Sequence, residues 1–355
     1  MKNKIWIYAL VFAIFSFTQC KMDDANANAS TITDSTVVAG KDTSPQISKG
    51  ESEDPSGVSI DSLMRRYRYD SAWTSMPEVL PGAILPRNRI IAFYGNLFSK
   101  RMGILGELPE KEMIAQLKKE MKNWEAADPL TPLVPALHVI VTTAQRLPGR
   151  DKMYRLRMSK DMVFKVKNMA DSIDGLTFLD LQIGHSSVAR ELVPWDSLLS
   201  LPTVHLGLDP EFAMHTKKVP GTIMGRMDAA DINVAIDFLE EKVKRLNLPP
   251  KVLIIHRFKS LMVSNAEKIK RTPYVQVVMD MDGWGAKELK FHSYRAYIQK
   301  EPVQYTGFKL FYNNDTKYGK KLLTPEEVLT LWPKPMYVQY QWSVVSGQWS
   351  VVSGQ

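Results

Sequence analysis

The sequence has a single cysteine, Cys20, so no disulfide can form within the chain and stability must come from packing. The apolar run at residues 5–17 is 13 residues long, and a membrane-spanning helix needs about 20. Chemical signatures are missing too. The first expected strand has no His-x-His pair, and the chain has no His-Glu-x-x-His, nucleophile elbow or complete P-loop. The chain therefore cannot be identified from a motif as a His-Glu-x-x-His metalloprotease, a hydrolase with a nucleophile elbow or a P-loop protein.

The charge of +8 and the pI of about 9.2 favour anionic surfaces, but Lys and Arg are scattered along the chain. The densest group, Lys118, Lys119 and Lys122, shares its predicted helix with several Glu residues. A mixed face of this kind is typical of solvated surface. We therefore expect no nucleic-acid partner.

The N-terminus has the pattern of an export signal. Lys2 and Lys4 precede the apolar run, and Cys20 lies at its junction with a polar segment. Residues 1–19 resemble a bacterial lipoprotein signal with Cys20 as the lipidated residue. The Phe-Thr-Gln-Cys junction departs from the usual lipobox and is similar to those of spirochaetes and Bacteroidetes. The alternative is an ordinary secretory signal with an incidental cysteine.

Residues 20–58 have few large apolar side chains and predict a disordered tether. Together with the signal, the tether predicts a protein of the bacterial cell envelope, lipid-anchored to a membrane or secreted. The lipid is the only membrane contact that we expect.

Eight short, β-rich runs follow, most of them separated by helical segments. This alternation predicts parallel strands and a single (β/α)8 TIM barrel over residues 59–341. The expected strands are Ile90–Gly95, Ala136–Val141, Thr177–Ile183, Val204–Asp209, Val252–Arg257, Val275–Asp282, Gly307–Tyr312 and Tyr337–Gln341.

Helices are predicted over residues 109–127 and 228–246, after a capping box at Thr324, and over residues 60–73, where a helix would plug the barrel bottom. Residues 342–355 are a duplicated low-complexity tail, so we expect the barrel to lack its usual last helix.

The period of two along the strands predicts which side chains face inward. In the fourth strand, Val204, Leu206 and Leu208 face the helices, while His205 and Gly207 face the interior. Polar residues at the strand ends should therefore meet in one cup. The candidates for catalysis are Glu211, Asp280, Asp180 and Asp209, and those for substrate binding are Tyr94, Asn96, His138, Gln182, His256, Arg257, Asp282, Lys309, Tyr312 and Gln339. His205, which lies deeper, is expected to be a core histidine.

Paired carboxylates favour glycoside hydrolysis, with Glu211 as the acid and Asp280 or Asp180 as its partner. This hypothesis needs no cofactor, and its partner is a carbohydrate or another small polar ligand. A metal-dependent hydrolase is the first alternative, with N/O ligands from His138, Asp180, Glu211, His256 and Asp280 and a divalent metal. The second is a non-catalytic, ligand-binding lipoprotein.

Several segments resemble an uncharacterised family of exported bacterial proteins. They are Tyr94–Asn96 with Arg101–Glu107, Val204–Phe212, Val278–Gly283 and Tyr305–Tyr312. The layout is also similar to glycoside-hydrolase-type TIM barrels. No activity follows from the family resemblance, and a fold alone does not determine function.

Overall fold

The computed structural model describes residues 59–67, 76–100, 102–216 and 218–343. The predicted signal peptide, Cys20, the tether and most of the duplicated tail lie outside the described residues. Among the helices that the structure does describe, none is both long and apolar enough to cross a membrane.

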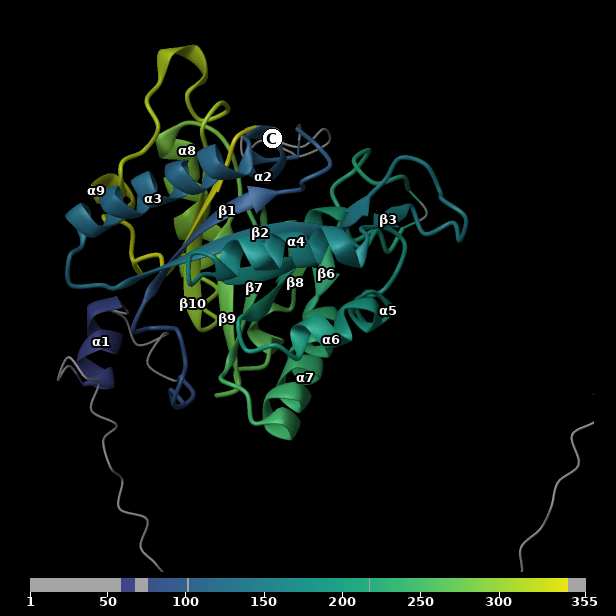
Figure 1. Cartoon of the computed structure of the whole chain (residues 1–355), viewed down its shortest axis with the longest axis horizontal. Coiled ribbons are helices and arrows are strands. Elements are labelled where there is room, and N and C mark those ends of the chain that lie inside the picture. Colours follow the sequence, from purple (N-terminus) through teal and green to yellow (C-terminus); the bar gives the residue numbers. More distant parts are fainter. Residues whose placement is uncertain (1–58, 68–75, 101, 217, 344–355) are drawn as a thin grey trace, which may run out of the picture. The chain divides into compact units, whose positions relative to one another are not determined.

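Eight parallel strands close into a barrel, which confirms the predicted (β/α)8 fold (Figure 1). Closure comes from β1, which pairs with β11 on one side and β2 on the other. The barrel strands are β1 (Arg89–Gly95), β2 (Leu133–Ala144), β4 (Leu176–Leu181), β5 (Val204–Leu208), β7 (Lys251–Arg257), β9 (Val275–Met281), β10 (Tyr305–Phe311) and β11 (Tyr337–Gln341). All eight predicted strands are present, with shifts of a few residues at their ends.

Three short strands lie outside the barrel. β3 (Arg155–Arg157) forms an antiparallel hairpin with β2, and β6 (Met227–Asp228) pairs with β8 (Val263–Ser264). The outer helices are α2 (Ile104–Glu107), α3 (Glu110–Ala127), α4 (Lys160–Asp171), α5 (Val188–Leu192), α6 (Asp196–Leu199), α7 (Ala229–Leu246), α8 (Lys287–Ser293) and α9 (Pro325–Val328). Asp228 caps α7 and Thr324 caps α9, each in a capping box.

α1 (Ile60–Tyr67) lies at the end of the barrel opposite the β2–β3 hairpin (Figure 1), within the predicted helix 60–73, whose residues 68–73 lie outside the described residues. Leu63 and Tyr67 pack with Leu85 against the lower interior side chains, among them Ile90 and Val252. The apolar lower half therefore supports the polar residues above it.

Side-chain alternation divides the core into two layers, as the period of two predicts. Leu206 and Leu208 of β5 pack outward with the helices, whereas Ala92, Phe178 and Ile254 pack inside the barrel. The inward-facing residues nearer the strand ends are polar.

Candidate functional site

Three side chains from three strands meet inside the upper barrel. Nε2 of His138 on β2 lies 3.3 Å from Oδ1 of Asp180 on β4, and Nε2 of His256 on β7 lies 3.4 Å from the same oxygen. All three side chains are fully buried, and these three atoms lie within 4.8 Å of one another. Among the described residues, none of the three atoms has a hydrogen-bond partner. Three potential metal-ligand atoms thus face one another, and none of them forms a hydrogen bond with another.

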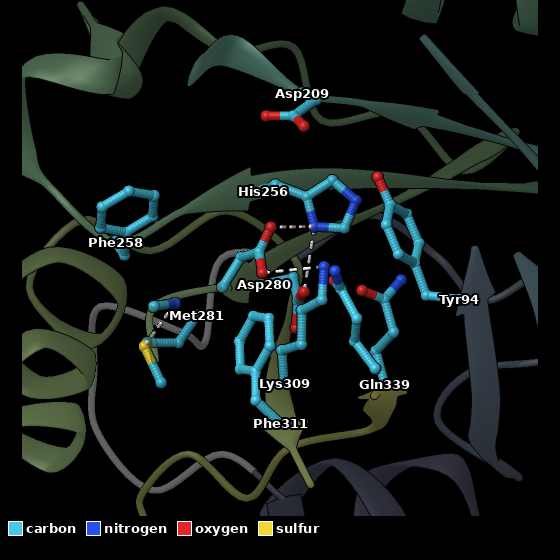
Figure 2. Close-up of polar contacts among 12 residues, drawn as sticks. Tyr94, Asp209, His256, Phe258, Asp280, Met281, Lys309, Phe311 and Gln339 are labelled. Atoms are coloured by element: carbon cyan, nitrogen blue, oxygen red, sulfur yellow. Dashed lines mark hydrogen bonds and ion pairs between the residues drawn. The ribbon is translucent and has the colours of Figure 1, made fainter. Parts of the chain in front are cut away.

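His256 is held from its other nitrogen. Nδ1 lies 3.2 Å from Oδ2 of Asp280 and 3.3 Å from Oδ2 of Asp282, so it carries a proton and donates toward these carboxylates (Figure 2). Burial opposes a charge on the ring. The carboxylates of Asp282, Asp180 and Asp280 outweigh this effect and raise the pKa of His256 well above its usual value. The ring orientation is therefore determined by the Asp280 and Asp282 carboxylates.

His138 is held by β11. Its Nδ1 lies 2.6 Å from the hydroxyl of Tyr337 and 2.9 Å from Nε2 of Gln339, and its ring stacks on Phe178. Burial lowers the pKa of His138 to about 4, although Asp180 acts in the opposite direction. The ring is therefore neutral at pH 7, and because Nδ1 accepts from the Gln339 amide, its single proton lies on Nε2.

Asp180 is ionised at neutral pH. Burial raises its pKa, but the nearby imidazoles of His138 and His256 outweigh burial and lower the pKa below its usual value. Its second oxygen, Oδ2, accepts a 2.8 Å hydrogen bond from the Tyr94 hydroxyl. The carboxylate is thereby fixed with Oδ1 facing the two imidazoles.

Further charged groups surround the three ligand candidates. Nζ of Lys309 lies 2.9 Å from Oδ1 of Asp282 and 3.8 Å from the centre of the Tyr94 ring. Nε2 of Gln182 donates to Asp209 at 3.2 Å. Burial and the nearby charge of Asp180 raise the pKa of Asp209 to about 7. Asp209 can therefore gain or lose a proton near neutral pH.

The aspartates of this interior outnumber its cations. Asp180, Asp209, Asp280 and Asp282 are at most 2% exposed, and the buried cations that interact with them are Lys309, His256 and Lys290. Uncompensated charge in a buried site is costly, and a bound divalent cation would offset it.

Glycine makes room for this arrangement. A Cβ atom at Gly207 on β5 would lie 2.3 Å from Nε2 of His138 and 2.5 Å from Oδ1 of Asp180. Any larger residue at position 207 would therefore push both groups away.

The structure corrects three of the site predictions. Arg257 follows His256 by one residue and so points out of the barrel, where it bonds Glu301 and the backbone oxygen of Tyr297. Tyr312 lies beyond β10 and donates to Glu120 on α3.

The third is Asn96, whose side chain donates to the backbone oxygen of Ile140 and accepts from the backbone nitrogen of Phe98. Among the residues that the structure describes, none of the three side chains is hydrogen-bonded to His138, Asp180 or His256.

The other candidates lie inside the barrel, and His205 is a core histidine as predicted, accepting from the backbone nitrogen of Val252. Glu211 is buried in the short turn η3 (Pro210–Phe212), after β5, and is not one of the three converging ligands. Sequence reasoning missed Tyr337, although its two-residue spacing from Gln339 indicated an inward side chain. It also missed the steric role of Gly207.

The cluster is closed to solvent, since the side chains that form it are at most 2% exposed. A surface cavity of about 540 Å³ lies elsewhere, lined by residues that include Leu97, Met162 and Lys165.

Comparison with protein families and with curated proteins found no match. Among solved structures, the chain is similar to a 5-methylcytosine deaminase from Klebsiella pneumoniae liganded with phosphonocytosine, with a TM-score of 0.28 and 12% identity. The alignment covers 59% of this chain and 45% of the deaminase chain. At this TM-score the similarity carries no argument about chemistry, and the resemblance to an exported family stays a prediction.

Proposed function

We propose that the protein is a metal-dependent hydrolase whose divalent ion is held by His138, Asp180 and His256. The observation that carries the proposal is the convergence of three buried donor atoms that have no hydrogen-bond partner in the described part of the chain. Two imidazole nitrogens and one carboxylate oxygen suit zinc and other first-row divalent ions, and binding would displace the Nε2 protons of His138 and His256. The donors lie toward the carboxyl ends of barrel strands, where barrel enzymes have their active sites.

A divalent ion in such a site supplies an acidified water molecule and a positive charge that polarises the bond to be cleaved. The residues of the chain have separate tasks. Asp280 and Asp282 orient His256, and Tyr337 with Gln339 orients His138.

Asp209 is the candidate for proton exchange. It lies in the same buried interior, is positioned by Gln182, and has an oxygen, Oδ1, without a hydrogen-bond partner among the described residues. Its pKa of about 7 suits a group that accepts and returns a proton at neutral pH.

A glycosidase that needs no metal is the second candidate. The pKa of Asp180 is lowered while that of Asp209 is raised to about 7, and this separation is typical of a nucleophile and an acid in glycoside hydrolysis. Asp209 would then replace Glu211 as the acid.

The experiment is a metal reconstitution of the full chain. After chelation, the protein is titrated with Zn²⁺ or Mn²⁺, and bound metal and thermal unfolding are measured. We expect one ion per chain. At a free-metal concentration of 100 times the dissociation constant, the free energy of unfolding should rise by about 2.7 kcal/mol.

His138→Gln and His256→Gln should abolish both effects. His205→Gln is the matched control, because His205 is equally buried on the adjacent strand β5 but lies outside the cluster. Loss of binding in all three variants would point to general unfolding, and binding retained in the first two would refute the site.

The reaction is then identified with chromogenic ester, amide, phosphoester and glycoside substrates. Hydrolysis that appears only with the ion supports the first candidate. Glycoside hydrolysis that survives chelation and disappears in Asp209→Asn supports the second.

We also propose that the barrel is anchored in the cell envelope through a lipid on Cys20. The support is the sequence pattern of residues 1–20 alone. Radiolabelled palmitate should be incorporated by the unmodified chain and not by Cys20→Ala; equal labelling would refute the anchor.

A further inference from the structure

The loops at the carboxyl ends of the barrel strands collect cations that are far apart in the sequence. We define the mouth loops as the described residues of the segments 96–100, 102–103, 145–154, 209–216, 218–226 and 312–324, which follow β1, β2, β5 and β10. In a closed parallel barrel, loops that follow strands all lie at the same end. Figure 1 shows the β2–β3 hairpin and the bottom helix α1 at opposite ends of the barrel. The charges on these loops therefore contribute to the same end of the molecular surface.

Two of the mouth loops carry three exposed cations each. They are Arg146, Arg150 and Lys152 in the β2–β3 hairpin, and Lys317, Lys320 and Lys321 after β10.

Lys100, Lys218 and Arg226 add three more exposed cations. None of these nine side chains forms an ion pair within the described part of the chain, whereas several helix cations do, such as Lys244 with Glu240.

Acidic residues in the same loops do not balance these cations. Asp209, Glu211 and Asp315 are buried, and the partly exposed Asp151 is already paired with Arg155 and Arg190. The mouth therefore presents a positive surface above the acidic interior.

Large apolar side chains project from the same surface. Phe98 is 70% exposed and Leu147 is 76% exposed, and each lies in a mouth loop beside a cation. A nucleic-acid base or a sugar ring can stack on Phe98, but neither polymer buries the aliphatic Leu147 in an apolar phase. A phospholipid surface attracts the cations and also buries the apolar groups.

We propose that the mouth loops dock the barrel on an anionic phospholipid membrane, in addition to any lipid anchor. The predicted tether permits this orientation. An extended segment of the length of residues 20–58 spans at most about 140 Å, which exceeds the diameter of a single barrel domain. The docking is independent of the proposed hydrolase activity.

The test uses the chain from residue 20 onward, the predicted product of signal cleavage, with Cys20→Ser, so that all variants lack both the apolar run of residues 5–17 and the lipid. Sedimentation with vesicles of phosphatidylglycerol and phosphatidylcholine (about 30:70) measures partitioning, and pure phosphatidylcholine vesicles measure binding that does not depend on lipid charge. We expect binding to require phosphatidylglycerol. It should fall steeply at 0.5 M salt, where screening shortens to about 4 Å.

Two triple variants remove the loop cations, R146Q/R150Q/K152Q and K317Q/K320Q/K321Q. Each cation contributes about a fivefold increase in partitioning, so each triple should bind roughly 100-fold more weakly. The matched control is K118Q/K119Q/K122Q on α3, which removes the same charge from an exposed helix face. Equal losses in the control and the mouth triples would overturn the proposal.

The apolar contribution is tested with F98S/L147S, which should weaken vesicle binding roughly tenfold. Leu130→Ser is its control, because Leu130 is 74% exposed in the loop before β2, at the other end of the barrel. Binding to dextran sulfate is measured in parallel. If F98S/L147S binds vesicles normally, and the two mouth triple variants lose affinity for dextran sulfate as strongly as for vesicles, the surface binds an anionic polymer. That result would also overturn the membrane proposal.

Discussion

Gly207→Ala is the sharpest perturbation of the proposed metal site, because one added methyl group meets two of the three ligands. The new Cβ atom would lie 2.3 Å from Nε2 of His138 and 2.5 Å from Oδ1 of Asp180. Ordinary contacts are about 3.5–4.0 Å, so at least one side chain must move by about 1 Å. Gly207 does not have a left-handed backbone, so alanine brings no backbone strain.

Two quantities should change. Overpacking should lower the free energy of unfolding of the metal-free protein by about 1–3 kcal/mol. Zinc bonds to nitrogen and oxygen are about 2.0–2.2 Å long, so a ligand displaced by about 1 Å is lost. We expect zinc affinity to fall at least about 100-fold, or about 2.7 kcal/mol.

The assay is a zinc titration against a chromogenic chelator, with chemical unfolding measured in parallel. Gly175→Ala is the control, since its Cβ would lie 3.0 Å from the backbone oxygen of Pro135, before β4 and away from the ligands. It should lower stability and leave zinc affinity unchanged. If Gly207→Ala binds zinc within about threefold of the unmodified chain, the ligand assignment is wrong.

Three further predictions concern charged groups outside the site. Asp128→Ala should cost about 3–5 kcal/mol in urea unfolding, because it leaves the guanidinium of the fully buried Arg89 without its carboxylate partner; a loss under 1 kcal/mol would contradict this. Asp228→Ala should remove the cap of α7 and cost about 1 kcal/mol at pH 7. Hydrogen bonds, first from the backbone of Ala230, lower the pKa of Asp228 to about 2, so its contribution is present above pH 4 and lost as the pH falls toward 2. Burial lowers the pKa of Lys251 to about 7, so the unfolded chain holds more protons above that pH and stability should rise by about 1–4 kcal/mol from pH 7 to 10. Lys251→Met should flatten that rise, and an unchanged pH slope would refute the assignment.

The alternation of strands and helices predicted the barrel. The period of two within the strands placed His138, Asp180 and Asp280 on the inward side of their strands, but it left the choice between His256 and Arg257 open. The alternation of side chains depends only on the local strand conformation, so it holds regardless of how the rest of the chain folds.

The ligand set could not be predicted in the same way. Which polar side chains meet depends on the stagger between strands that are far apart in the sequence. Tyr312, for example, belongs to a long polar strand end, but it lies just beyond β10 and turns toward α3.

The charge distribution shows the same limit. The cations were interpreted as scattered because the mouth loops are separated by whole strand–helix units. Only barrel closure brings Arg146 and Lys320 to the same end of the molecule.

The most direct test of the central claim is X-ray absorption at the zinc edge of the reconstituted full chain. The proposed site predicts two imidazole nitrogens and carboxylate oxygen at about 2.0–2.2 Å, with no sulfur ligand. His256→Gln should remove one imidazole from the spectrum and leave the other. A sulfur ligand from Cys20, or a shell of oxygens without imidazole, would contradict the site built by His138, Asp180 and His256.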